Sequence, residues 1–146
     1  VYWPGKVEPG VSDALFTQVD LYASFASLVG HELKPDEAPD SYNMIETILG
    51  KSNKGREVMV EEAFTLSLRE GDWKYIAPFE GDIPDWMENK DIEVGLQNTP
   101  QLYNLGADPA EQINLADKEK KQLEKMSAIL EEIIEKNGSR PGFQQD

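Results

Sequence analysis

The sequence predicts an α+β fold in which a small antiparallel sheet is packed by a long C-terminal helix. Segment 58–68 alternates apolar and polar residues, as half-buried strands do, and a tight turn at 70–72 leads to a return strand over Trp73–Ile76. Stretch 117–136 repeats apolar residues at helical spacing among many Glu and Lys residues. Because the strands are grouped and do not alternate with helices, the order favours α+β over α/β.

The N-terminal third predicts one strand and one helix. Val1–Trp3 is a short apolar run that the Pro4–Gly5 pair stops, as a strand ends in a turn. Asp20 is a good N-cap, and the apolar residues that follow it fall on one helical face. Gly30 is expected to end this helix in the left-handed conformation.

The remaining elements follow from turn residues and apolar spacing. A polar, proline-punctuated connector (31–41) precedes a short helix over 42–49, which Gly50 stops. Segment 79–100 has the composition of a loop, and Gln101–Leu105 that of another strand. Gly138 and Pro141 are expected to close the long helix.

Composition excludes several classes of function. The chain has 146 residues and a formal net charge of -14, which repels phosphate backbones and anionic lipid. It contains no cysteine, so disulfides, thiolate zinc sites and thiol nucleophiles are excluded, while the redox compartment stays undecided. No apolar run is long enough to span a bilayer. The opening VYWPGK has no basic n-region, so we expect no signal peptide there, and it reads like the interior of a longer protein.

Residues that often carry chemistry are few and scattered. The single histidine, His31, beside a helix end, is expected to be a surface or capping residue. Adjacent carboxylates diverge on regular structure, so Glu131–Glu132 is expected to be solvated. Glu61–Glu62 lies near a strand end, and one member of this pair is a candidate to face a cleft. The acidic residues of the long loop lack the spacing of a calcium loop; they are Asp82, Asp85 and Asp91. The sequence thus predicts no complete active site.

Two stretches resemble conserved patterns of the sulfatase family. The first, 1–30, is similar to a strand that ends in Trp-Pro-Gly, followed by Lys, a Pro-Gly turn, Asp-Leu and a helix that ends in Gly. The matching residues are Trp3, Pro4, Gly5, Lys6, Pro9, Gly10, Asp20, Leu21 and Gly30. Where the family usually has Pro-Thr after that Asp, this chain has Ala23–Ser24.

The second stretch resembles the family's C-terminal hairpin and the run that follows it. The matching residues are Arg69, Gly71, Trp73, Lys74, Leu102, Tyr103, Leu105, Asp108, Pro109, Glu111, Asn114, Leu115 and Ala116, with Asn104 replacing the usual Asp. These residues are interpreted as structural. Asp108–Pro109 suits a turn, and Glu111 and Asn114 can satisfy backbone groups ahead of the long helix. Trp73 is expected to pack against the covering helix.

The resemblance implies an alkaline phosphatase-like architecture. Residues 1–30 would be the tail of a large α/β catalytic domain, 31–54 a connector, and 55–146 a C-terminal α+β subdomain. The family's nucleophile is a formylglycine made in a Cys/Ser-x-Pro-x-Arg motif, and its calcium is held by Asp and Asn. These motifs lie upstream of the Trp-Pro-Gly strand, and none falls on a position of this chain. We therefore expect no catalytic residue, metal ligand or cofactor here, and no activity from the chain alone.

In a parent sulfatase, this subdomain would support the fold and close one side of the pocket for a sulfated small molecule or carbohydrate. Glu61, Glu62 and the loop Phe79–Pro100 are the candidates for that wall. Its expected partner is its own N-terminal catalytic domain, and family habit suggests a periplasmic or secreted protein. Two alternatives stay open: a fragment of a phosphate or phosphonate monoester hydrolase, and a free-standing acidic protein-interaction module. The fragment predicts exposed apolar surface, whereas the module predicts a polar, fully covered one.

Overall fold

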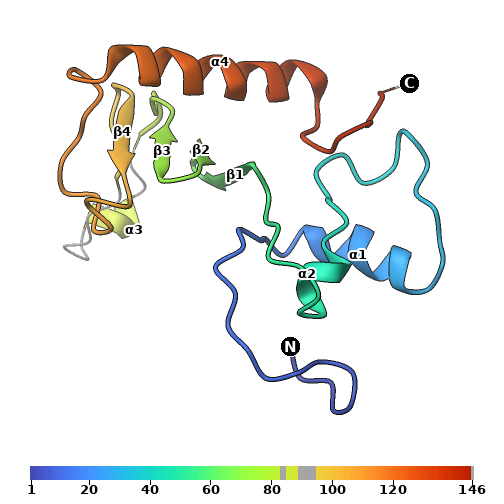
Figure 1. The fold of residues 1–146 in the computed structure, drawn as a ribbon. Coiled ribbons are helices and arrows are strands. Elements are labelled where there is room, and N and C mark those ends of the chain that lie inside the picture. The colour runs from blue at the N-terminus through green and yellow to red at the C-terminus, as the bar shows by residue number, and fades with distance from the viewer. Residues whose placement is uncertain (83–84, 89–94, 146) are drawn as a thin grey trace. The chain divides into compact units, whose positions relative to one another are not determined.

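The computed structural model describes residues 1–82, 85–88 and 95–145, and the chain divides into two compact units (Figure 1). Unit 1 comprises Val1–Met59 and Glu131–Asp146, and unit 2 comprises Val60–Leu130. The division at residues 30 and 54 inferred from the resemblance concerns a parent protein and stays a prediction. None of the helices in the described part of the chain is both long and apolar enough to cross a bilayer.

Unit 2 is built on a four-stranded sheet of order β1-β2-β3-β4. Its strands are β1 (Val58–Ala63), β2 (Thr65–Glu70), β3 (Trp73–Ile76) and β4 (Gln101–Asn104). β3 pairs antiparallel with β2 and with β4, so that each strand returns along the one before it. The predicted antiparallel sheet and its β2–β3 turn are confirmed, with Gly71 in the turn at φ 56°.

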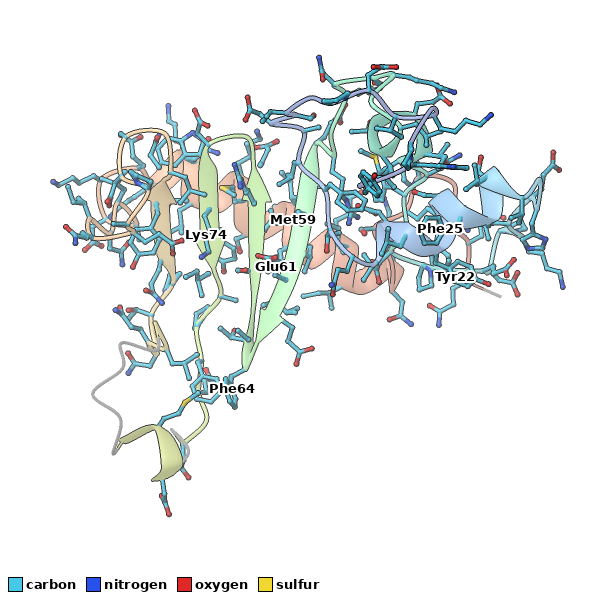
Figure 2. The ribbon with its side chains drawn as sticks, turned by 90° about the horizontal axis from the view of Figure 1, so that it is seen from below. Tyr22, Phe25, Met59, Glu61, Phe64 and Lys74 are labelled. Carbon is cyan, nitrogen blue, oxygen red and sulfur yellow. The ribbon has the colours of Figure 1, made fainter. Side chains whose placement is uncertain are left out.

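The long helix α4 (Lys120–Lys136) confirms the amphipathic pattern. Its part up to Leu130 crosses one face of the sheet (Figures 1 and 2). The strand register places three buried side chains beside one another on the sheet, Leu68, Tyr75 and Leu102. Met126 and Leu130 are buried on α4. Each such side chain contributes about 1.5–3 kcal/mol by leaving water, and together they form the core of unit 2.

The chain reverses at Phe64, where the sequence predicted one extended segment. β1 ends at Ala63 and β2 begins at Thr65, so a single residue joins two neighbouring strands. Phe64 takes up the reversal with a φ of 67°, which is left-handed backbone. A residue with left-handed backbone in a turn is normally Gly, Asn or Asp. Because Phe favours β-strands, the sequence gives no sign of a turn at this position. The prediction of a continuous strand over 58–68 is therefore wrong.

Unit 1 holds two helices, α1 (Asp20–Leu28) and α2 (Ile45–Ile48), which contact each other. Gly30 and Gly50 follow them at φ 77° and 71°, which confirms both predicted stops. The predicted N-cap is wrong. Val19 occupies that position, and the Asp20 carboxylate is directed to other partners.

The first residues form a turn but no strand. Gly5 has φ 73°, and the Lys6 N–H donates to the Trp3 carbonyl over 3.1 Å, as expected for Pro4–Gly5. The strand predicted at Val1–Trp3 does not form, because no segment of unit 1 pairs with it and all of its residues are exposed. Strand pairing needs a neighbour that supplies its hydrogen bonds.

The segment after α4 is tied to the connector within unit 1. The Arg140 guanidinium donates to four carbonyl oxygens of one loop, those of Lys34, Pro35, Glu37 and Ala38. The predicted stop at Gly138 is confirmed: its N–H donates to the Ile133 carbonyl over 3.2 Å. A Cβ at Gly138 would lie 2.8 Å from the Pro39 carbonyl oxygen, so the close approach requires glycine.

Candidate functional site

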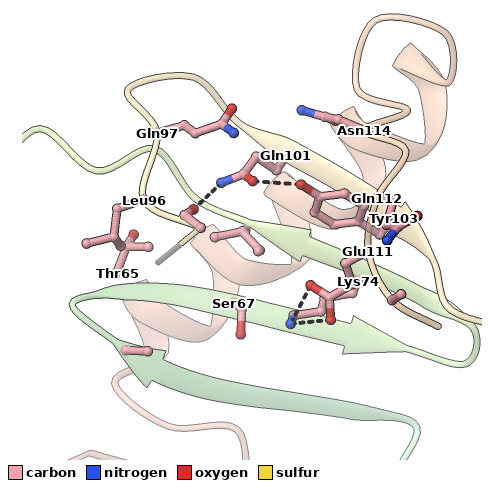
Figure 3. A pocket seen from close by; sticks show the side chains of 14 residues that line it. Thr65, Ser67, Lys74, Leu96, Gln97, Gln101, Tyr103, Glu111, Gln112 and Asn114 are labelled. Carbon is pink, nitrogen blue, oxygen red and sulfur yellow. Dashed lines mark hydrogen bonds and ion pairs between the residues drawn. The ribbon is translucent and has the colours of Figure 1, made fainter. Parts of the chain in front are cut away.

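A polar face of the sheet in unit 2 carries a hollow. Alternation along each strand places Ser67, Ile76 and Gln101 in one cross-strand row, and Arg69, Lys74 and Tyr103 in the next. Alternation puts them on the face opposite Leu68, Tyr75 and Leu102, and Figure 3 shows Ser67, Lys74, Gln101 and Tyr103 on that face. The same alternation that builds the apolar core on one side therefore builds a hydrogen-bonding surface on the other.

An ion pair stands at one side of this face. The Lys74 ammonium donates to both carboxylate oxygens of Glu111, over 2.7 and 2.8 Å. Both side chains are about three-quarters buried, and Glu111 holds a left-handed φ of 55°. The structure thus brings together two residues that were predicted only as separate members of a family pattern. The charges of Lys74 and Glu111 cancel within the pair.

Gln101 and Tyr103 form the floor of the hollow. The Gln101 side-chain amide donates to the Gly95 carbonyl over 2.6 Å, and its oxygen accepts from the Tyr103 hydroxyl over 2.8 Å. Gln101 is 1% exposed. Both ends of its amide are bonded, so the side chain is held in one orientation and keeps the Tyr103 ring in place.

The hollow has a volume of about 860 Å³, a size that suits a small ligand or a sugar residue. Hydroxyl and amide groups dominate its polar lining. The lining side chains from the strands and from the following loop include Thr65, Ser67, Lys74, Gln97, Gln101, Tyr103, Glu111 and Asn114. Among these described lining residues, no nucleophile is paired with a base.

Of the predicted wall, Glu61 and Glu62 lie beside this hollow but do not line it, whereas loop 79–100 lines it in part. Glu61 and Glu62 are exposed on β1, and the neighbouring Ala63 is a lining residue. Figure 2 places Glu61 on the sheet near its Phe64 end. Loop 79–100 contributes Gly95, Leu96 and Gln97 to the lining.

The described part of loop 79–100 also contains α3 (Asp85–Glu88), a short helix where no regular structure was expected. Asp91 and the rest of 89–94, like residues 83–84, lie outside the described residues. Within the described residues, no group of three or more His, Cys, Asp or Glu side chains is arranged to hold a metal ion.

A second polar cluster lies buried in unit 1. Asp20 is 0% exposed, and its carboxylate accepts from the Tyr42 and Thr17 N–H groups over 2.9 and 3.1 Å. The Arg56 guanidinium lies 3.4 Å from this carboxylate, stacks 4.0 Å above the Tyr42 ring, and donates to the Ser139 hydroxyl over 3.2 Å. Its Nε has no partner in the described chain. Sequence reasoning missed this cluster, because nothing in the local sequence marks Arg56 as a buried arginine.

His31 lies at the surface, as predicted, with 55% of its side chain exposed, and its Nε2 is 3.6 Å from Glu37. The Tyr22 hydroxyl donates to Glu37 over 2.8 Å. This hydrogen bond, followed by the one from the Lys34 N–H, lowers the pKa of Glu37, and the same bond raises the pKa of Tyr22. These contacts tie the connector to α1.

The other pattern residues lie in the loop between β4 and α4. The Asn114 side chain accepts from the Leu102 and Ala116 N–H groups, over 3.1 and 3.0 Å. Asp108 accepts from the Ile113 N–H over 2.7 Å, and Pro109 follows in a turn. The Leu115 N–H donates to the Leu102 carbonyl over 2.7 Å. These contacts seat the loop along β4 and place Glu111 over Lys74.

No protein-family model matches the chain. N-acetylgalactosamine-6-O-sulfatase of Bacteroides thetaiotaomicron is 38% identical over 135 residues, which cover 91% of this chain and 26% of that relative. Arylsulfatase A of Bos taurus is 26% identical over 128 residues, covering 80% of this chain and 25% of its own length. The chain therefore spans about a quarter of the curated relatives it matches.

A solved structure agrees with these relatives. It is described under the metabolism of multiple glycosaminoglycans by Bacteroides thetaiotaomicron, and it matches with a TM-score of 0.82 at 40% identity. The match covers 90% of this chain and 27% of that one. Sequence and fold agree over the same portion, so the chain belongs to the sulfatase family and matches its C-terminal portion.

Proposed function

We propose that this chain is the C-terminal part of a sulfuric ester hydrolase and that the parent protein acts on a sulfated carbohydrate. The observation that carries the proposal is the 38% identity to an N-acetylgalactosamine-6-O-sulfatase over nearly the whole chain. Fragments of phosphate or phosphonate hydrolases, and free-standing interaction modules, are not favoured by any relative described here. A 6-O-sulfated N-acetylhexosamine is the substrate that this relative supports.

The chemistry of the parent would reside outside this chain. The family supplies a formylglycine nucleophile and a calcium ion, and a cation beside the transferring sulfuryl group would stabilise its developing charge. Sulfatases of this kind are often exported, which supports a location of the parent protein in the periplasm or the medium. On this proposal the chain alone has no turnover, because its described residues offer binding groups and structural pairs only.

The proposed partner is the chain's own N-terminal catalytic domain. α1 carries apolar side chains that unit 1 leaves exposed: Phe25 is 50% exposed and Val29 78% exposed, with Leu28 beside them. Figure 2 shows Phe25 and Tyr22 on this helix. Contiguous exposed apolar surface normally marks a contact with another protein surface. A free-standing module would cover it, and we propose that the catalytic domain does so.

The proposed role of unit 2 is to support the fold and to close one side of the substrate pocket. Glu61, Glu62 and the described part of loop 79–100 remain the candidates for this wall. Support comes from their exposure on β1 and from the position of Ala63 at the hollow. Loops and strand ends commonly build specificity around a fixed scaffold.

Substrate assays with the full-length parent test this proposal. The substrates are the 6-O-sulfate, the 4-O-sulfate and the 6-phosphate of N-acetylgalactosamine. We expect kcat/KM to be highest for the 6-O-sulfate by at least about tenfold, the ratio that 1.4 kcal/mol of transition-state discrimination gives. A preference for the phosphate would overturn the proposal, and equal rates on both sulfates would remove only its positional part.

A further inference from the structure

We propose that the hollow on the polar face of the β2–β3–β4 sheet is a glycan subsite that binds an uncharged sugar residue attached to the sulfated one. The inference rests on the proposed function, since it assigns a second binding position within the same substrate. It concerns a site built only from residues of unit 2.

The charge balance of the hollow selects for an uncharged ligand. Lys74 is the only lysine or arginine among its described lining residues, and Glu111 is the only acid. Each is bonded to the other through both carboxylate oxygens. Among the described lining residues, a sulfate or uronate would meet no unpaired cation and would have to shed its water without compensation. Arg69 lies in the same cross-strand row as Lys74 but does not line the hollow, and its Nε donates to the Gly71 carbonyl. Hydroxyl and N-acetyl groups are uncharged, so they avoid the desolvation cost of an unpaired anion.

The remaining lining groups match the outline of a sugar ring. Ser67 and Thr65 present hydroxyl oxygens on β2, and Gln97 presents a side-chain amide at the rim (Figure 3). The Thr65 hydroxyl donates to the Ala77 carbonyl over 3.2 Å and the Ser67 hydroxyl to the Glu61 carbonyl over 3.4 Å, so both oxygens remain to accept from a ligand. Tyr103 is buried beneath these groups, and its hydroxyl is held by Gln101, so it forms part of the floor. An amide that donates and accepts, together with oxygens that accept, suits sugar hydroxyls, which do both.

The floor of the hollow is built before any ligand arrives. Gln101 is almost completely buried and bonded at both ends, to Gly95 and to Tyr103. The Lys74–Glu111 pair fixes the loop that forms the opposite edge. A ligand therefore meets an ordered surface and loses little affinity to ordering of the protein, which is what a specific subsite requires.

The test compares two substrates of the full-length parent enzyme. One is N-acetylgalactosamine 6-sulfate, and the other is the same sugar joined to one uncharged N-acetylhexosamine. The variant Ser67→Tyr fills the hollow, and Gln97→Ala removes a rim group with little change in packing. The matched control for bulk is Ala128→Tyr, at an exposed position on α4, and the control for amide loss is Gln145→Ala in the exposed tail.

The quantity that decides is the ratio of kcat/KM for the disaccharide to that for the monosaccharide. We expect a wild-type ratio above about 10, a fall of about tenfold in Ser67→Tyr, and a fall of a few fold in Gln97→Ala. Both controls should keep the wild-type ratio. An unchanged ratio in Ser67→Tyr and Gln97→Ala, or a wild-type ratio near one, would overturn the subsite. Failure to hydrolyse either sulfated sugar would instead overturn the proposed function, and the subsite with it.

Discussion

At the scale of single residues, the buried Asp20–Arg56 pair is the contact whose loss should cost most. Asp20→Ala leaves the Arg56 guanidinium buried without its carboxylate, and we expect a loss of about 3–5 kcal/mol in the free energy of unfolding. Urea denaturation measures it, with Asp117→Ala, at an exposed aspartate, as the control. The double variant Asp20→Leu/Arg56→Met should recover part of the loss. A cost near that of Asp117→Ala would show that the pair is not buried in solution.

The Lys74–Glu111 pair should contribute less, because both side chains keep contact with solvent. A double-mutant cycle with Lys74→Met and Glu111→Gln is expected to give a coupling energy of about 1 kcal/mol that falls with added salt. The comparison pair is Glu132–Lys136, one turn apart on α4 and more than half exposed, for which we expect about 0.3–0.5 kcal/mol. Equal coupling in the two pairs would contradict the partial burial of Lys74.

Glu37 gives a prediction for pH. Its pKa is lowered chiefly by the Tyr22 hydrogen bond, so the folded chain binds its proton less readily than the unfolded chain. The resulting stability is present above the ordinary glutamate pKa of about 4.3 and is lost as pH falls through the lower folded value. Unfolding midpoints should therefore separate wild type from Glu37→Gln at pH 6 and converge as the solution becomes more acidic. A constant difference across that range would rule out the linkage.

The hypothesis that Glu62 forms part of the wall of the substrate pocket can be tested with a single substitution. Glu62→Gln in the full-length parent should shift the relative kcat/KM values across a set of sulfated sugars by a few fold, because it changes a charge at the pocket edge. Glu132→Gln makes the same change on the exposed face of α4 and should leave those values alone. Matching profiles for the two variants would remove Glu62 from the wall.

At the scale of elements, α4 and the β2–β3 hairpin followed from local pattern alone. The apolar spacing of 117–136 predicted the helix to within a few residues, because apolar residues recur on one face in every successive turn. The reversal at Phe64 was not predictable, since no residue there favours a left-handed backbone. The polar face of the sheet was predictable in part, because alternation along β2 puts Thr65 and Ser67 on one side. Gln101 joins them only through pairing with β3, which sequence spacing does not reveal.

The packing of α4 on the sheet makes its own prediction. Met126 is fully buried in unit 2, so Met126→Ala should lower the free energy of unfolding by about 2–5 kcal/mol through lost burial and the cavity left behind. Glu124→Ala, two positions away and exposed, should change it by less than about 0.5 kcal/mol. Chemical denaturation compares them, and similar values would mean that this part of α4 does not cover the sheet.

At the scale of the whole molecule, the account depends on a missing partner surface. The exposed apolar residues of α1 should make the isolated chain bind an apolar fluorescent dye and grow in apparent size with concentration. The full-length parent should do neither. Phe25→Ser in the isolated chain should reduce dye binding, whereas Glu124→Ser should not. A monomeric isolated chain without dye binding would favour the free-standing module.

The most direct test of the central claim is sulfate release by three proteins: the full-length parent, the parent without residues 1–146, and this chain alone. The account predicts hydrolysis of N-acetylgalactosamine 6-sulfate by the full-length protein and none by this chain. It also predicts a large loss when this portion is removed, because the fold and the pocket wall go with it. Release of sulfate by the isolated chain, or undiminished activity without it, would contradict the account.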